Sequence, residues 1–175
     1  MEKDKNMIKI KLYLEMCIEP GSRIRCNKKE AVVGAIIPEN GNFNVITVQH
    51  LLKVGGCNLG DPVYIGKFKG TITRILYDLD LAMATFKVPS SLVNLIEIGS
   101  PRLGPAYSLK EGKKNHCTVL SLGRTYHYLA FAHRSLPLPG DSGSPIIQDG
   151  KIVGVLCSVF FNSATAIASS LERFL

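Results

Sequence analysis

The sequence contains no tryptophan, and only 7% of its 175 residues are aromatic and 20% are charged. With 46% hydrophobic residues, this composition excludes a wholly disordered chain, and the length suits one domain with a sizeable core. No apolar run reaches the length of about 18 residues that a membrane span needs. The first eleven residues carry four lysines and no long apolar stretch, which is not typical of a signal peptide. We therefore expect a soluble, cytoplasmic protein that does not enter a membrane.

The cysteines lack the spacing of a metal site. There is no CxxC pair, and five cysteines cannot all pair within one chain. No cysteine and histidine have zinc-like spacing, so we expect neither a metal nor another cofactor. We interpret the thiols as reduced ones in a reducing compartment. They are Cys17, Cys26, Cys57, Cys117 and Cys157.

Sixteen glycines and nine prolines divide the chain into short apolar segments, which favours an all-β fold over a helix bundle. The strict alternation over residues 8–16 predicts a half-buried strand after a frayed, flexible tail at 1–7. Residues 168–175 are the one segment with a helical pattern. Further strands are predicted at 31–37, 43–48, 62–65, 70–76, 81–88, 116–122, 128–133, 145–147 and 152–160.

The formal net charge of +7 permits an acidic partner without requiring one. The lysines gather in the tail and at residues 110–114, with no aromatic residues interleaved among them as a platform for bases. We interpret them as solvated charges, so nucleic-acid binding is not favoured.

One octapeptide, GDSGSPII at residues 140–147, has the residue types of a nucleophile loop. Ser142 lies between Asp141 and Gly143, and glycine at position 140 permits a tight turn. Such a turn can aim the N–H groups of residues 140 and 142 at one point beside the hydroxyl, as an oxyanion hole requires. An ordinary Gly-Asp-Ser turn before a strand has the same pattern, so the motif needs partners elsewhere.

A serine nucleophile needs a histidine base and a carboxylate that orients it. No histidine follows Ser142, because the last one is His133, and this excludes the Ser-Asp-His order of α/β-hydrolases. The Asp-His-Ser order would need an aspartate before His50, where only Asp4 in the tail is available. The order His-Asp-Ser remains open.

His50 ends a predicted apolar strand, and Asp80 begins another with Asp78 on the same face. With these residues in place, three blocks resemble the His, Asp and Ser blocks of chymotrypsin-fold serine proteases. They are TVQHLL at 47–52, DLDLAMATF at 78–86 and GDSGSPIIQDGKIVGV at 140–155. The resemblance covers residues 31–175 and is closest to compact, disulfide-free bacterial and viral members. The family pattern Asp-Leu-Ala favours Asp80 over Asp78 as the acid.

The resemblance implies two six-stranded antiparallel β-barrels with the site between them and a short C-terminal helix. Residues 1–175 would form one peptidase domain, with barrels at about 8–95 and 100–175. It further implies that Ser142 is the nucleophile, His50 the general acid–base and Asp80 the orienting carboxylate. The amides of Gly140 and Ser142 would form the oxyanion hole. The expected activity is hydrolysis of peptide bonds through an acyl-enzyme.

The same resemblance indicates where substrate binds. The backbone of Cys157, Ser158 and Val159 would pair with a protein or peptide substrate as an added strand. Leu136 lies at the position of the floor of the primary pocket. Leu156 stands where relatives selective for Gln or Glu carry a histidine, so the two leucines favour a small or apolar P1 residue. Cys157 replaces a serine that supports the acid in many relatives.

In this family, a cation neutralises the carboxylate at the position of Asp141. The lysine-rich start of the chain does not match the amine that fills this role in trypsin-like enzymes, and Arg124 and Arg134 are the candidates in its place. Two alternatives to an active protease stay open, a catalytically silent peptide-binding module and a protease that cleaves itself once and keeps its own C-terminus in the cleft. The sequence does not set the oligomeric state.

Overall fold

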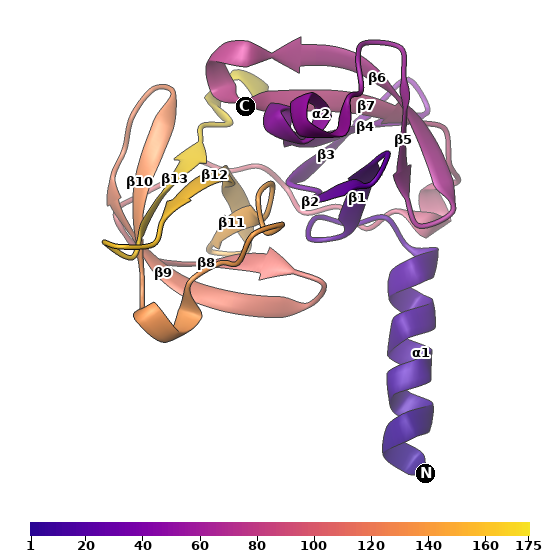
Figure 1. Ribbon diagram of the computed structural model, residues 1–175, viewed down its shortest axis with the longest axis horizontal. Coiled ribbons are helices and arrows are strands. Elements are labelled where there is room, and N and C mark those ends of the chain that lie inside the picture. The colour runs from indigo at the N-terminus through magenta and orange to yellow at the C-terminus, as the bar shows by residue number, and fades with distance from the viewer.

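The computed structural model describes the backbone of residues 1–175 and the side chains of 1–9 and 17–175, and most of its elements are β-strands (Figure 1). The first sheet contains β1 (Arg23–Cys26), β2 (Lys29–Val32), β3 (Ala35–Glu39), β4 (Asn42–Val48), β5 (Pro62–Ile65), β6 (Phe68–Leu76) and β7 (Leu81–Phe86). The second contains β8 (Gly104–Lys110), β9 (Lys113–Ser121), β10 (Tyr126–Phe131), β11 (Pro145–Gln148), β12 (Lys151–Phe160) and β13 (Thr165–Ser169). The helices are α1 (Glu2–Met16) and α2 (Gln49–Gly55), with 3₁₀ turns at Tyr77–Leu79, Ser90–Leu92, His133–Ser135 and Glu172–Phe174.

The second half of the chain forms the closed six-stranded barrel that the resemblance implies, in the order β10-β13-β12-β11-β8-β9. Its interior is a separate apolar cluster that includes Leu129, Ile146 and Leu156. Closure leaves this half without edge strands, since each strand is bonded on both sides over part of its length.

The first half does not close. Its seven antiparallel strands run β2-β1-β5-β6-β7-β4-β3 and curl into an open half-barrel around a larger core that includes Ile46, Leu81 and Phe86. The prediction of a closed six-stranded barrel here is therefore wrong. The edge of β2 does not pair with β3, and the amide of Val32 at this edge donates to the carbonyl of Ser142 in the other half (2.9 Å).

Both chain ends differ from expectation. Residues 2–16 form helix α1, which extends away from the two sheets (Figure 1), and not a strand at 8–16 preceded by a frayed tail. A strand needs a neighbour to bond, whereas Lys, Glu, Leu and Met favour a helix that satisfies its own backbone. The predicted helix at 168–175 is also wrong, because β13 continues to Ser169 and only a 3₁₀ turn follows. Ala166 and Ala168 point into the barrel core as strand residues.

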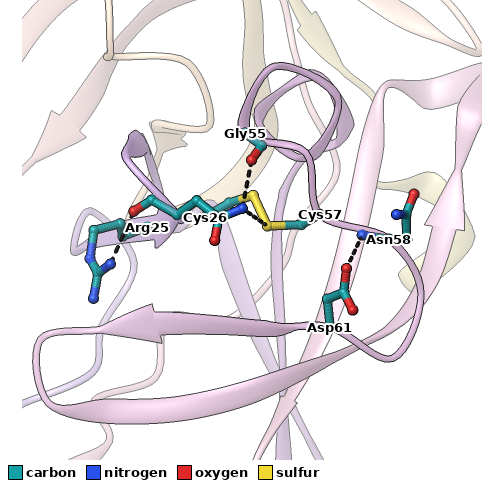
Figure 2. The surroundings of a disulfide bond; sticks show 7 residues. Arg25, Cys26, Gly55, Cys57, Asn58 and Asp61 are labelled. Carbon is teal, nitrogen blue, oxygen red and sulfur yellow. Dashed lines mark hydrogen bonds between the residues drawn. A yellow bond between two sulfur atoms is a disulfide. The ribbon is translucent and has the colours of Figure 1, made fainter.

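Two of the five cysteines are bonded to each other, contrary to the interpretation of five reduced thiols. A disulfide joins Cys26 at the end of β1 to Cys57 after α2, across a sequence separation of 31 (Figure 2). Cys17, Cys117 and Cys157 are free. Within the described part of the chain, no helix combines the length and apolarity that crossing a membrane requires.

Candidate active site

His50 and Asp80 lie side by side because the strands that precede and follow them are paired. β4 ends at Val48, which pairs with Leu81 at the start of β7. Asp80 directly precedes Leu81, and His50 follows Val48 by two residues, so the pairing brings the two close together. The His50 amide donates to Asp80 Oδ1 (3.0 Å), and the ring Nδ1–H donates to Asp80 Oδ2 (2.7 Å). Both carboxylate oxygens therefore hold the histidine, which fixes a tautomer with Nε2 as a proton acceptor.

Asp78, the alternative acid, points elsewhere. Its carboxylate pairs with Arg173 near the C-terminus, which lowers the pKa of Asp78, and its carbonyl accepts from the hydroxyl of Tyr126 (3.1 Å). The backbone separates the two acids, since Asp80 adopts a left-handed conformation (φ 50°) after the 3₁₀ turn that contains Asp78. Asp80 is thus the one of the two that contacts His50.

The turn that carries Ser142 is bound to the first sheet. The Ser142 carbonyl accepts from Val32, and a Cβ at Gly143 (φ 95°) would overlap the carbonyl of Val32, so glycine is required there. The hydroxyl of Thr47, three residues before His50, also donates to the Val32 carbonyl (2.8 Å). Within residues 17–175, no hydrogen bond joins the Ser142 hydroxyl to His50. Such contacts are often long without substrate and tighten on binding.

Residues 138–141 form a turn directly before Ser142. The amide of Asp141 donates to the carbonyl of Leu138 (3.0 Å), with Pro139 and Gly140 at the central positions. The positive φ of Gly140 (90°) makes this a type II turn, which suits a Pro-Gly pair and roughly reverses the central peptide relative to type I. Among the described residues, the N–H groups of Gly140 and Ser142 have no hydrogen-bond acceptor. They are free to bind an anionic oxygen.

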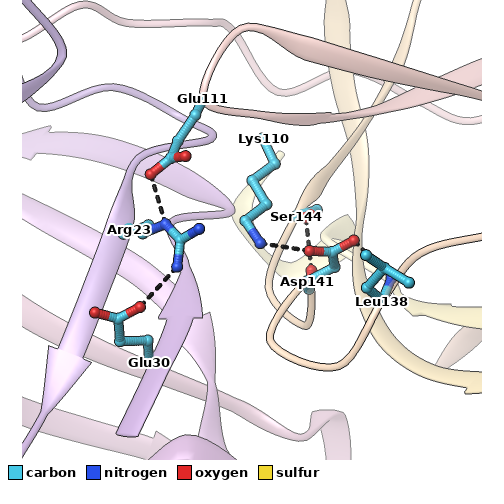
Figure 3. Close-up of polar contacts among 7 residues, drawn as sticks. All are labelled: Arg23, Glu30, Lys110, Glu111, Leu138, Asp141 and Ser144. Carbon is cyan, nitrogen blue, oxygen red and sulfur yellow. Dashed lines mark hydrogen bonds and ion pairs between the residues drawn. The ribbon is translucent and has the colours of Figure 1, made fainter. Parts of the chain in front are cut away.

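Asp141 is buried behind this turn and is paired with a residue that the sequence analysis missed. Lys110 Nζ lies 2.5 Å from Asp141 Oδ1, and the Leu138 amide donates to Oδ2 (2.8 Å), as Figure 3 shows. The expectation of Arg124 or Arg134 is therefore wrong. The pairing of β8 with β11, which opposes Ser108 and Ile146, carries Lys110 to this position. Nothing in the local sequence around Lys110 signals that contact.

The predicted substrate-binding residues cluster on β12 and the loop before the turn. β11 pairs with β12 as far as Val155, and Leu156 still bonds to Gly143 and Ser144 before the turn ends. From Cys157 onward, β12 is bonded on one side, by β13. Leu136 and Val159 pack against the core of the second barrel and give this region an apolar surface, while Leu156 is fully buried. Ser158 is exposed.

Cys157 is buried near Asp80. Its Sγ is 3.9 Å from the carbonyl of Leu79, the residue before Asp80. Burial, with a smaller contribution from the Asp80 carboxylate, raises the pKa of the thiol to about 12. The side chain is therefore a neutral group beside the carboxylate and is not a competing nucleophile.

No family model and no curated protein matches this chain. Its fold, however, is similar to those of solved proteases. Thermobifida fusca protease A matches with a TM-score of 0.71 and 13% identity over 91% of this chain and 94% of that one. Nocardiopsis protease matches with a TM-score of 0.69 and 15% identity, over 90% of this chain and 95% of that one. The NSP4 proteinase of equine arteritis virus matches with a TM-score of 0.58 and 17% identity, over 86% of this chain and 72% of that one. The chain has the chymotrypsin fold.

Within the chymotrypsin fold, the two sheets hold different parts of the site. The open first sheet carries His50 and Asp80, and the closed second barrel carries the turn of Ser142 and the free edge of β12. The bond between Val32 and Ser142 joins the two parts directly. This contact holds the turn of Ser142 against the first sheet.

Proposed function

We propose that this protein is a serine endopeptidase that uses His50, Asp80 and Ser142 as its catalytic residues. The observation that carries the proposal is the two-point contact of Asp80 with His50 on the sheet to which the turn of Ser142 is bound. An imidazole fixed in this way can accept a proton at Nε2 from a serine hydroxyl. The chymotrypsin fold supports the same function.

In this mechanism, Ser142 Oγ attacks the scissile carbonyl while its proton passes to His50 Nε2. The oxyanion forms between the amides of Gly140 and Ser142, each of which contributes about 3–4 kcal/mol in related sites. His50 then gives the proton to the leaving amine, and the C–N bond breaks to leave an acyl-enzyme. A water molecule, deprotonated by His50, hydrolyses the ester and regenerates Ser142.

Substrate binds as an added strand along the free edge of β12, where Cys157, Ser158 and Val159 offer backbone groups. The P1 side chain then faces Leu136 and Val159, which pack on the apolar core of the barrel. No carboxylate lines this region to hold Lys or Arg, within residues 130–140 and 154–160. We therefore expect a small or apolar P1 residue. A peptide library cleaved mainly after Arg, Lys, Glu or Gln would contradict this preference.

Burst kinetics with an activated ester test the acyl-enzyme step. We expect one equivalent of alcohol to be released per folded protein before the steady state, because deacylation is slower than acylation for esters. The burst disappears in Ser142→Ala and persists in Ser100→Ala, in which an exposed serine of the inter-barrel segment is removed. A folded wild-type protein without a burst and without peptide hydrolysis contradicts the proposal.

The disulfide bears on location. Cys26–Cys57 is of a kind that forms in oxidising compartments and is rare in the cytosol. The cytoplasmic location expected from the sequence therefore stays a prediction, and this bond weighs against it.

A further inference from the structure

A hollow of about 510 Å³ opens between the β1–β2 turn and the end of α2. Its chemistry is basic, because three of its lining residues are cations and none is a carboxylate. Val54, whose side chain is 64% exposed, provides an apolar wall. The lining residues are Arg25, Asn27, Lys28, Lys29, Val54 and Gly55.

The two walls of this hollow are fastened together. The Cys26–Cys57 disulfide joins the end of β1 to the segment after α2, and the Asn27 side-chain amide donates to the carbonyl of Gly55 (2.7 Å). A Cβ at Gly55 would overlap Cys26, so the helix end sits directly against the disulfide (Figure 2). The hollow is therefore formed before any ligand arrives, which reduces the entropy lost on binding.

Its cations are not neutralised by the protein. Lys28 and Lys29 form no ion pair among the described side chains, and the guanidinium of Arg25 bonds only to the carbonyl of Asn27 (3.0 Å). Glu30, the nearest acid along β2, is bonded to Arg23 (2.7 Å). A second cavity with several basic lining residues differs in this respect, because its Lys110 is already paired with Asp141.

The positive surface continues across the sheet. β5 places Tyr64 between Arg25 of β1 and Lys69 of β6 in a single cross-strand row. The guanidinium of Arg25 lies 4.9 Å from the centroid of the Tyr64 ring and covers its face. That ring is consequently not free to stack on a base, and this favours an acidic peptide over a single-stranded nucleic acid.

We propose that this basic hollow binds an acidic segment of the peptide substrate, outside the residues that flank the scissile bond. The inference rests on the proposed protease function. Val54 lies four residues after His50 on α2, a rise of about 6 Å. An extended chain advances about 3.3 Å per residue, so a substrate that crosses His50 and runs along α2 reaches the level of Val54 after about two residues.

Matched peptides test the inference. One peptide ends close to the cleavage site, a second carries three Glu residues beyond it, and a third carries three Gln residues in their place, with the extension placed at either end. Each exposed ion pair contributes a factor of about two, so kcat/KM for the Glu peptide exceeds that for the Gln peptide about eightfold at low salt. The advantage falls as salt is added, because the charges are exposed.

A pair of double variants assigns the effect to the hollow. Lys28→Glu with Lys29→Glu reverses the preference, so that a Lys extension is now cleaved faster than a Glu extension. Lys113→Glu with Lys114→Glu makes the same change of charge in the β8–β9 hairpin of the other barrel and retains the preference for Glu. If both double variants behave alike, net charge explains the effect and the inference is overturned.

Failure of the inference differs from failure of the proposed function. If short peptides are hydrolysed but Glu and Gln extensions give equal kcat/KM, only the inference is wrong. If nothing is hydrolysed, fluorescence anisotropy of a labelled Glu-rich peptide still measures binding to the hollow, and its absence in the wild type overturns the inference too. Binding of single-stranded DNA in preference to that peptide would also overturn it.

Discussion

Lys110→Met removes the cation that neutralises Asp141 and provides the sharpest test of how the oxyanion turn is held. In the native protein the carboxylate is bonded by Lys110 on one oxygen and by the Leu138 amide on the other. Without the ammonium group, the charge of Asp141 is left without a counter-ion in a site where its side chain is 10% exposed. The carboxylate gains hydration by moving outward and displaces the turn that contains Gly140.

The size of the effect follows from the burial of the pair. Loss of one partner from a fully buried ion pair costs about 3–5 kcal/mol. Because the Lys110 side chain is 23% exposed, we expect a smaller cost of about 2–3 kcal/mol. If this cost falls on the active arrangement of the turn, kcat decreases about 30-fold to 150-fold while KM changes little.

The assay is the rate of labelling by a fluorophosphonate, together with peptide hydrolysis and thermal unfolding on the same samples. Lys110→Arg retains the positive charge, so we expect it to keep most of the wild-type labelling rate. If Lys110 served only to fill space, the Arg and Met variants would lose labelling rate to a similar extent. Lys113→Met removes an exposed lysine from the same hairpin and serves as the matched control. A folded Lys110→Met protein that labels within twofold of the wild type refutes the reasoning.

Three further predictions concern the turn, the disulfide and a buried histidine. Gly140→Ala places a side chain on a residue with φ 90°, which costs about 1–2 kcal/mol and favours a different turn in which the free amide points elsewhere. We expect kcat to fall at least tenfold, and an unchanged kcat would contradict this. The Cys26–Cys57 disulfide closes a loop of 31 residues, so its reduction should lower the free energy of unfolding by about 3–4 kcal/mol, as measured by urea titration. A decrease of less than about 1 kcal/mol would contradict this. Burial lowers the pKa of His127, partly offset by Glu172, so the unfolded chain binds more protons below about pH 6.5. Stability should therefore fall from pH 7 to pH 5, less in His127→Gln, and equal slopes would exclude this cause.

The parts of the site that depend on short sequence blocks were predictable. Gly140 and Gly143 lie on either side of Asp141 and Ser142 and adopt positive φ angles that glycine adopts readily, so this requirement is visible in adjacent residues. His50 and Asp80 each adjoin a buried strand, and the pairing of those strands brings them together. A local pattern suffices where the backbone itself delivers the side chain.

The contacts between distant segments were not predictable. Lys110 reaches Asp141 through the register of β8 against β11, and Cys26 reaches Cys57 because the end of α2 packs against the end of β1. In neither case does the local sequence around the contacting residues indicate which distant residue they meet. The bond from Val32 at the edge of β2 to Ser142 in the other half is a third contact of this kind.

The ends of the chain were predicted incorrectly because alternation alone does not supply a partner. The pattern at residues 8–16 has the period of a strand, yet the segment is helical. At the other end, Leu171 and Leu175 have the spacing of one helix face, yet β13 continues to Ser169 and only a 3₁₀ turn follows. In both places the neighbouring element, and not the local pattern, decides the outcome.

The most direct measurement of the central claim is the position of a fluorophosphonate adduct determined by mass spectrometry of the folded wild-type protein. The proposed mechanism predicts a single adduct on Ser142, with labelling abolished in His50→Ala. No adduct, or an adduct on another residue that persists in His50→Ala, would contradict it.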